Sequence, residues 1–165
     1  MGTFVLFART NHLSRLELRS GKREQVRAQL APELSGATES PELFGGVERL
    51  LRRYAKGDPV DFDVPVDLTA LKPFTRLVLT EIRKIPYGKI ASYGMIAKRL
   101  GYSSAPRAVG QALKRNSIPI VIPCHRVVKG DGTLGGFDMG LDAKTRLHSH
   151  EGIRVDDLRK SMIQA

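Results

Sequence analysis

Cysteine is the scarcest reactive residue in this chain, since the 165 residues contain a single one, Cys124. A single thiol excludes an intrachain disulfide and any zinc site built from several cysteines, which is typical of a reducing compartment. Tryptophan is absent, and no run approaches the roughly 20 apolar residues that a membrane span requires. The first 20 residues carry charges through their middle, unlike a secretory signal. We therefore expect a cytoplasmic protein that does not associate with membranes.

Acidic residues are nearly missing from one region. Between Lys72 and Lys129, twelve basic residues face one acid, Glu81, a net charge of +11, while the other 15 basic and 16 acidic residues sum to −1. A solvated basic surface would explain this excess. An excess confined to one region also favours a polyanionic partner, of which nucleic acid is the commonest.

The first third of the sequence predicts a hairpin and a helix. Residues 3–10 and 15–19 are short and rich in strand-forming or alternating residues. Ser40 and Pro41 are typical of a helix start, with serine as the cap and proline at the first helical position. Residues 60–68 then alternate between valine and aspartate over much of their length, which indicates an extended connector.

Three helices are predicted in the second half. Residues 72–85 and 93–100 have apolar side chains at helical spacing, with Ser92 as the cap of the second helix. Gly101 ends that helix, and a third begins near Ala105. Two short helices joined by a tight turn indicate a helix-turn-helix, although many helical hairpins never contact DNA.

The third helix has basic ends and a small-residue centre. Arg107 lies at its start and Lys114 and Arg115 at its end, with Ala108 and Gly110 between them. Small side chains let a helix backbone approach a partner closely, and basic ends can contact phosphates.

Cys124 follows a short apolar run. Residues 118–122 predict a buried strand that ends just before Cys124, and His125 and Arg126 come next. Neighbouring imidazole or cationic groups lower the pKa of a thiol and make it a better nucleophile. A buried structural cysteine is the simpler alternative. The glycine-dense loop at 130–140 indicates either a flexible connection or backbone shaped around a flat ligand.

Together these motifs resemble one family, the O6-alkylguanine-DNA alkyltransferases. The resemblance spans about two thirds of the chain, from about Leu50 to Val155, and its motifs occur in the family's order. They are Ile85–Gly88, Ser92–Gly94, Arg107–Gly110, Asn116, Ile122–Val128, the glycine loop to Gly140, Lys144, and Glu151 with Gly152.

The resemblance implies an α/β fold in two lobes. A small N-terminal α/β domain with a ribonuclease H-like layout is expected at residues 1–58, and a connector at 59–70. A mostly helical alkyltransferase and DNA-binding domain with the helix-turn-helix follows at 71–165.

The resemblance also implies direct reversal of DNA damage. The protein would flip an O6-alkylguanine out of double-stranded DNA, contacted through the minor groove, and transfer the alkyl group irreversibly to Cys124. This suicide reaction needs no cofactor and no metal. We expect a monomer, with cooperative assembly on DNA left open.

Catalytic roles follow by resemblance, motif by motif. Glu151 orients His125, which takes the proton of Cys124 through a water molecule. Tyr93 donates a proton to N3 of the leaving guanine, and Asn116 ties the recognition helix to the active-site turn.

Substrate contacts are implied in the same way. Arg107 replaces the flipped base in the stack, and the small Ala108 and Gly110 suit a narrow groove. Further DNA contacts are Ser92, Lys114 and Arg115, and the base pocket comprises Val127, Val128, Gly136, Phe137, Asp138 and Lys144.

Several positions depart from the family pattern. Phe137 replaces a tyrosine and is followed by Asp138, Ser117 replaces a proline, and His148 occupies a usually apolar position. His148 and His150 cannot share a helix face, so they do not predict a metal site.

Three alternatives use the same residues. A helix-turn-helix regulator with a structural or redox-sensing Cys124 explains the basic region. It does not explain why Cys124 and His125 are adjacent and coupled to Glu151. A cysteine hydrolase using Cys124 and His125 leaves the basic region unexplained. Alkyltransferase-like damage sensors resemble this sequence but lack the cysteine.

Overall fold

A two-stranded antiparallel hairpin begins the chain in this computed structural model, which describes residues 2–34 and 36–163. Strand β1 (Gly2–Arg9) pairs with β2 (His12–Ser20), which confirms the predicted hairpin. The turn is shorter than expected, because only Thr10 and Asn11 separate the strands, with φ angles of 46° and 63°. Positive φ at both turn positions matches the twist of the flanking strands.

Two helices complete the N-terminal part, α1 (Arg23–Leu30) and α2 (Pro41–Ala55). Helix α2 starts where the sequence predicts, with Pro41 in its first turn, although the Ser40 side chain forms no capping hydrogen bond within the described residues. The apolar spacing buries Val47, Leu51 and Tyr54 on one face of α2. That face directs Tyr54 toward the C-terminal part.

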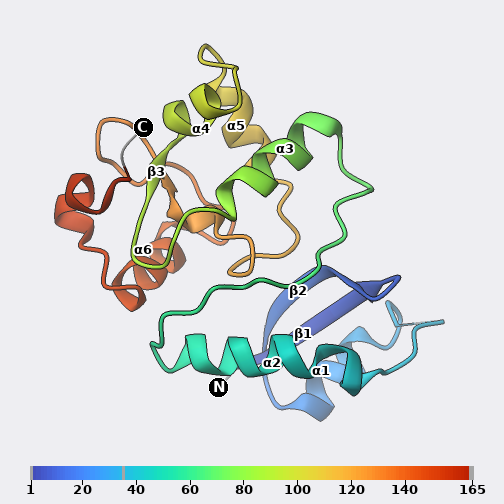
Figure 1. Cartoon of the computed structure of the whole chain (residues 1–165). Helices are drawn as coiled ribbons and strands as arrows, with labels where there is room; N and C mark the ends of the chain where they lie inside the picture. The colour runs from blue at the N-terminus through green and yellow to red at the C-terminus, as the bar shows by residue number, and fades with distance from the viewer. Residues whose placement is uncertain (1, 35, 164–165) are drawn as a thin grey trace.

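The segment between α2 and the next helix is extended, as predicted. Val60, Phe62 and Val64 are buried, while the intervening Asp61 and Asp63 are exposed. The guanidinium of Arg83 donates hydrogen bonds to the carbonyl groups of Phe62 and Val64, at 3.2 and 2.8 Å. The connector is thereby fixed to the C-terminal part (Figure 1).

The C-terminal part is mostly helical. Helices α4 and α5 pack against each other and against α3, and the short strands β3 and β4 form a parallel pair that the sequence did not predict. The elements are α3 (Pro73–Ile82), β3 (Ala91–Ser92), α4 (Tyr93–Arg99), α5 (Pro106–Leu113), β4 (Val127–Val128), α6 (Leu141–His150), and 3₁₀ helices at Cys124–Arg126 and Val155–Ser161.

The prediction of a strand at residues 118–122 is wrong. This segment is buried as expected, but it turns on itself: Val121 N donates to Pro119 O and Ile122 N to Ile118 O. Ile120 adopts a φ of 71°, which is rare for a β-branched residue. A short apolar run indicates burial but does not distinguish a strand from a buried turn. Cys124 therefore begins a 3₁₀ turn instead of ending a strand.

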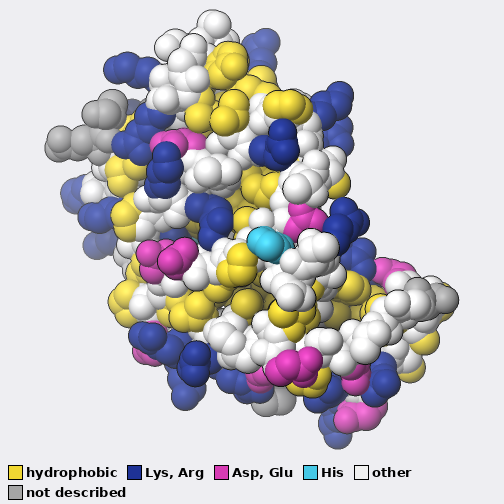
Figure 2. Space-filling model, turned by 45° about the vertical axis from the view of Figure 1, so that its right-hand side comes forward, with side chains coloured by type: hydrophobic (Ala, Val, Ile, Leu, Met, Phe, Trp, Pro, Cys, Tyr) yellow, Lys and Arg dark blue, Asp and Glu magenta, His cyan; other side chains and the backbone are white. Residues whose placement is uncertain are grey.

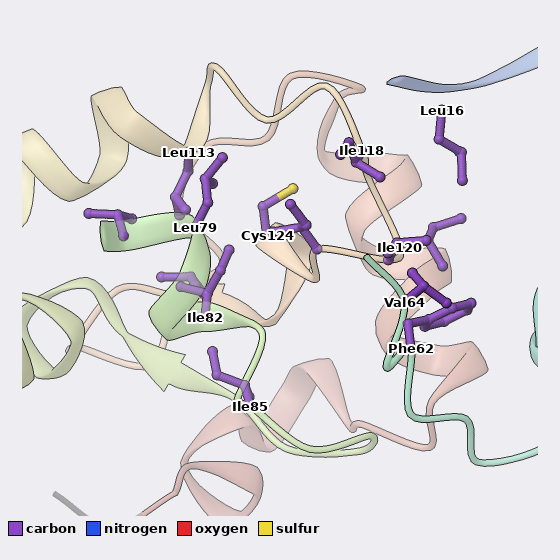
Figure 3. Close-up of a cluster of buried hydrophobic side chains, with 14 of the residues drawn as sticks. Leu16, Phe62, Val64, Leu79, Ile82, Ile85, Leu113, Ile118, Ile120 and Cys124 are labelled. Atoms are coloured by element: carbon purple, nitrogen blue, oxygen red, sulfur yellow. The ribbon is translucent and has the colours of Figure 1, made fainter. Parts of the chain in front are cut away.

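One hydrophobic cluster joins both parts of the chain. It contains Leu16 and Leu51 from the N-terminal part and Ile82 and Ile118 from the C-terminal part (Figure 3). The α/β class is confirmed. The ribonuclease H-like layout, the helix-turn-helix and the three domain ranges stay predictions. Among the described helices, none has the length and apolarity to cross a membrane.

Candidate active site

Cys124 lies in the hydrophobic core at the start of the 3₁₀ turn, with 9% of its surface exposed. Figure 3 places it between Leu79 and Ile82 on one side and Ile118 on the other. The Asn116 side chain donates hydrogen bonds to Cys124 Sγ at 3.0 Å and to the carbonyl of Ile122 at 2.8 Å. Asn116 lies three residues after the end of α5, so these hydrogen bonds connect the end of that helix to the thiol.

The thiol is not activated at rest. Burial raises the pKa of Cys124, and the opposing effects of the Asn116 hydrogen bond and the Lys144 charge do not overcome it. Burial therefore outweighs the lowering of this pKa by neighbouring groups. Arg126, next but one in sequence, directs its guanidinium to Glu151 instead. A protonated thiol requires a base at the moment of reaction.

His125, the residue after Cys124, is held by Glu151. Its Nε2 lies 2.8 Å from Oε1 of Glu151, and both side chains are fully buried. An ionised carboxylate only accepts, so Nε2 carries the proton and Nδ1 has a free lone pair. Nδ1 forms no hydrogen bond with any described residue. Burial lowers the pKa of His125 more than Glu151 raises it, which keeps the ring neutral and able to accept.

Glu151 is held by a full set of donors. Arg126 Nε donates to Oε2 and Nη2 to Oε1, both at 2.9 Å, and Gly88 N donates to Oε2 at 3.2 Å. The Tyr54 hydroxyl donates to Oε1 at 2.8 Å. Burial alone raises the pKa of Glu151, but hydrogen bonds from His125 and Arg126 lower it to about 2. The carboxylate is therefore anionic across the physiological range.

Sequence reasoning missed two of these partners. The sequence pattern indicates Arg126 only as a neighbouring cation and gives Tyr54 no role at the site. The adjacency of Arg126 to His125 was a usable signal, because a buried arginine needs an acid. For Tyr54 the sequence holds no such signal, since it lies 97 residues from Glu151.

Helix α6 packs against the 3₁₀ turn at Cys124 and forms hydrogen bonds with its backbone. Lys144 donates to the carbonyl groups of Val127 and Leu134, both at 2.6 Å, and burial lowers its pKa to about 8. His148, four residues later on the same face, donates through Nε2 to the carbonyl of His125 at 2.7 Å. Both side chains are fully buried, and they fix the backbone on each side of Arg126.

Tyr93 stands near the thiol at the first position of α4. The Ser92 hydroxyl accepts from Met95 N at 3.0 Å, so Ser92 caps this helix as predicted. Burial raises the pKa of Tyr93, and a thiolate at Cys124 would raise it further, so its hydroxyl stays protonated. That hydroxyl donates to the carbonyl of Gly136 at 3.3 Å, so the glycine loop closes against Tyr93.

The predicted pocket residues lie in β4, in the glycine loop and on α6. Val127 and Val128 are fully buried in the β3–β4 pair, and the carbonyl of Val127 is engaged by Lys144. Phe137 is half-buried against the hydrophobic core, while Asp138 is exposed.

Exposed cations lie at both ends of helix α5: Arg107 in its first turn, and Lys114 and Arg115 just after its last residue, Leu113. Arg107, Ala108, Lys114 and Arg115 are exposed, and the three cations form no ion pair with any described residue. Gly110 lies against the Tyr93 ring, which a Cβ at that position would approach to 3.7 Å. Figure 2 shows Lys and Arg side chains spread over the visible face of the molecule, between hydrophobic side chains. The described residues contain no group of three or more metal-binding side chains.

These features define the class of protein. A buried thiol, a neutral histidine and an anionic carboxylate form a site for nucleophilic cysteine chemistry, and an exposed basic helix lies beside it.

The comparisons specify this class further. A family model described as "6-O-methylguanine DNA methyltransferase, DNA binding domain" matches residues 73–153. The methylated-DNA–protein-cysteine methyltransferase of Mycolicibacterium paratuberculosis is 43% identical over 116 residues, which cover 70% of this chain and 70% of the relative. That of Methanopyrus kandleri is 50% identical over 108 residues, 64% of this chain and 79% of the relative. The chain belongs to the 6-O-methylguanine DNA methyltransferase family.

Solved structures agree with this assignment. Mycobacterium tuberculosis OGT in complex with DNA is similar with a TM-score of 0.72 and 31% identity, covering 93% of this chain and 90% of that one. The O6-methylguanine DNA methyltransferase of Methanococcus jannaschii gives a TM-score of 0.65 at 33% identity, covering 92% and 89%. The similarity includes the N-terminal part, which the family model does not reach.

Proposed function

We propose that this protein repairs DNA by transferring the alkyl group of O6-alkylguanine to Sγ of Cys124, once per molecule. The observation that carries the proposal is the buried Cys124 thiol, followed directly in sequence by a histidine that Glu151 holds in the accepting tautomer. An exposed basic helix next to the thiol fits a DNA substrate.

The chemistry follows from the contacts. The proton of Sγ passes through a water molecule to Nδ1 of His125, and Glu151 stabilises the resulting imidazolium. The thiolate attacks the alkyl carbon, so the sulfur–carbon bond forms as the carbon–oxygen bond breaks. The electron pair stays on guanine, and a proton from the Tyr93 hydroxyl to N3 neutralises it. The proton held by His125 then returns through solvent to the Tyr93 oxygen, so that the proton lost from Sγ balances the one that guanine gains.

Single turnover follows from the product. The product is a thioether, which holds the alkyl carbon through a poor leaving group and has no acyl carbon for water to attack. A cysteine hydrolase would instead release its product and regenerate the thiol. The two functions therefore differ in whether the protein keeps the added mass.

DNA delivery is assigned to α5. The small residues Ala108 and Gly110 allow the helix to enter the minor groove, and Arg107 at its start fills the space of the flipped base. Lys114 and Arg115 at the other end contact phosphates, as does the segment around Ser92. The helix-turn-helix of α4 and α5 forms this DNA-binding unit.

The flipped base lies between Tyr93 and the glycine loop. Phe137 forms an apolar wall, while backbone groups of Gly136, Asp138, Val127 and Val128 contact its polar edge. The Tyr93 hydroxyl exchanges its present partner, the carbonyl of Gly136, for the base. Lys144 supports the pocket through the backbone of Val127.

The division into an N-terminal domain at 1–58, a connector at 59–70 and an alkyltransferase domain at 71–165 is part of the proposal. So are a cytoplasmic location and a monomeric protein without a cofactor. Hydrogen bonds of Arg83 to the connector support the boundary near its end.

Intact mass spectrometry tests the function directly. Incubation with duplex DNA containing O6-methylguanine should add one methyl group per protein molecule, and Cys124→Ala should add none. The control variant Cys124→Ala should still bind the duplex, because α5 is unchanged. Release of product with turnover, or an unchanged mass of the native protein, would contradict the proposal.

A further inference from the structure

The N-terminal part of the chain reaches the active-site carboxylate. Tyr54, in the last turn of α2, donates its hydroxyl proton to Oε1 of Glu151 at 2.8 Å. Tyr54 is only 3% exposed, so this hydrogen bond is protected from solvent. Residues that are 97 positions apart therefore share one buried hydrogen bond.

Tyr54 donates to the same carboxylate oxygen, Oε1 of Glu151, that accepts from His125. Oε1 of Glu151 also accepts from His125 Nε2 at 2.8 Å and from Arg126 Nη2 at 2.9 Å. A carboxylate oxygen has about two lone-pair positions, so these donors share its charge. The strength of the Tyr54 hydrogen bond therefore affects how much negative charge faces the histidine.

The side chain of Tyr54 is itself fixed. Its backbone carbonyl accepts a short hydrogen bond from His150 Nε2, and its ring lies 4.9 Å from that of His150 and 5.8 Å from that of Phe62, centroid to centroid. Burial and then the charge of Glu151 raise the pKa of Tyr54, so the hydroxyl stays a donor at every pH of interest. A locked ring and a permanent donor suit a positioning role.

We propose that Tyr54 is a positioning residue for the Glu151–His125 relay, and that the N-terminal part thereby takes part in the alkyl transfer. This inference rests on the proposed function. The hydroxyl fixes the direction of the carboxylate and limits the basicity of His125. It acts through Glu151 and does not touch the thiol.

Other groups around His125 also act on its protonation. Cys124 and Arg126 adjoin it in sequence, α6 provides Lys144 and His148, and Glu151 follows that helix. None of these is altered by a change of Tyr54 to phenylalanine, which removes one oxygen and leaves the ring. The effect of that change can therefore be assigned to the hydrogen bond with Glu151.

The test compares Tyr54→Phe with Tyr87→Phe. The Tyr87 hydroxyl donates to the carbonyl groups of His150, at 2.9 Å, and Gly57, at 3.3 Å, so it lies in the same region but forms no hydrogen bond with Glu151. Methyl transfer from duplex DNA and alkyl transfer from free benzylguanine are measured between pH 5.5 and 9, together with the unfolding temperature.

We expect Tyr54→Phe to slow transfer from both substrates about tenfold, as loss of an outer partner of a site commonly does. The acid limb of its pH–rate profile should move to higher pH, because Oε1 then acts more strongly on His125. Tyr87→Phe should keep the native profile even where its unfolding temperature falls equally. A native profile for Tyr54→Phe, or a rate loss that only follows the unfolded fraction, would overturn the inference.

A second measurement does not depend on activity. Nitrogen-15 NMR titration of the His125 ring should show a higher pKa in Tyr54→Phe than in the native protein. If that variant does not fold, 3-fluorotyrosine incorporated into the native chain strengthens the donor and should lower this pKa. An unchanged His125 titration would refute the role of Tyr54, whereas native protein without methyl transfer would refute the proposed function alone.

Discussion

At the scale of single residues, burial decides the state of each group of the site. The thiol of Cys124 is kept protonated by burial, and His125 is kept neutral by it. Glu151 stays ionised because its donors outweigh the same effect. A thiol that is protonated at rest is also protected from oxidation, since the thiolate is the form that reacts. The proton transfer to His125 therefore makes reactivity depend on the assembled relay.

His148 gives a prediction at this scale. Burial lowers its pKa and that of His125, so both rings must be neutral in the folded protein while the unfolded chain takes up protons near pH 6.5. Their stabilising contribution is complete above that pH and is lost as the pH falls through it. His148→Leu and His148→Gln should each reduce the slope of unfolding free energy against pH between 6.5 and 5. The reduction is at most about 1.4 kcal/mol per pH unit for one proton.

Denaturant unfolding at several pH values measures this slope. The two variants are expected to differ in absolute stability, because glutamine can still donate to the carbonyl of His125 and leucine cannot. Their slopes should nevertheless agree with each other. A native slope in both variants would show that His148 takes up no proton in that range.

At the scale of elements, each helix brings one part of the chemistry. Helix α4 begins with Tyr93, α5 carries the exposed cations, and α6 supports the turn at Cys124. Helix α2, from the other end of the chain, adds Tyr54. The active site is thus a junction of several helix ends, and each helix can be tested separately.

The loop after β4 is predicted to depend on Gly135. Its φ is +68°, and a Cβ there would lie 2.9 Å from Cε2 and 3.0 Å from the hydroxyl of Tyr93. Gly135→Ala should displace Tyr93 and slow alkyl transfer from free benzylguanine about tenfold or more, as misplacement of a reacting group does. Gly57→Ala is the matched control, because its φ of +92° is strained for alanine but no atom lies within 4 Å.

Both glycine variants should lose about 1–2 kcal/mol of stability, because alanine is strained at positive φ. Only Gly135→Ala should lose transfer rate when the two are compared at equal folded fraction. Equal rates in the two variants would mean that the loop does not position Tyr93.

Helix α5 gives a second prediction at this scale. Arg107→Ala should slow repair in duplex DNA about tenfold, because an unstacked base costs a few kcal/mol and the side chain offsets part of that. Its reaction with free benzylguanine should be unchanged, since no base is flipped. Arg76→Ala, an exposed cation on α3, is the control for a loss of charge. Equal losses of rate on both substrates would contradict the proposal that Arg107 fills the space of the flipped base.

At the scale of the whole molecule, the charge is unevenly distributed. The net charge of +10 arises within residues 72–129, and the cations of α5 form no ion pair with described residues. The hydrophobic core joins the N-terminal part to this basic region, and the hydrogen bond of Tyr54 joins it to Glu151. Association with DNA should therefore be electrostatic, with the protein binding in one orientation.

Salt dependence tests this orientation. A double change of Lys114 and Arg115 to alanine should reduce the slope of log affinity against log salt by about 2, one for each lost phosphate contact. The same change at Arg49 and Lys56, exposed on α2, should leave the slope unchanged. Fluorescence anisotropy with an undamaged duplex provides the measurement. Equal slopes for the two double variants would contradict binding through α5.

The sequence by itself determined the hairpin and the helices around the site, and its resemblance to the family indicated Cys124, His125 and Glu151 as the site residues. The hairpin and the helices depend on local spacing, caps and turns, which are written in contiguous residues. Tertiary structure alone decided that residues 118–122 form a turn, that β3 pairs with β4, and that burial keeps Cys124 protonated. It also decided that Arg126 and Tyr54 hold Glu151. Burial and hydrogen bonding between distant segments depend on how the whole chain packs, and local sequence patterns do not record it.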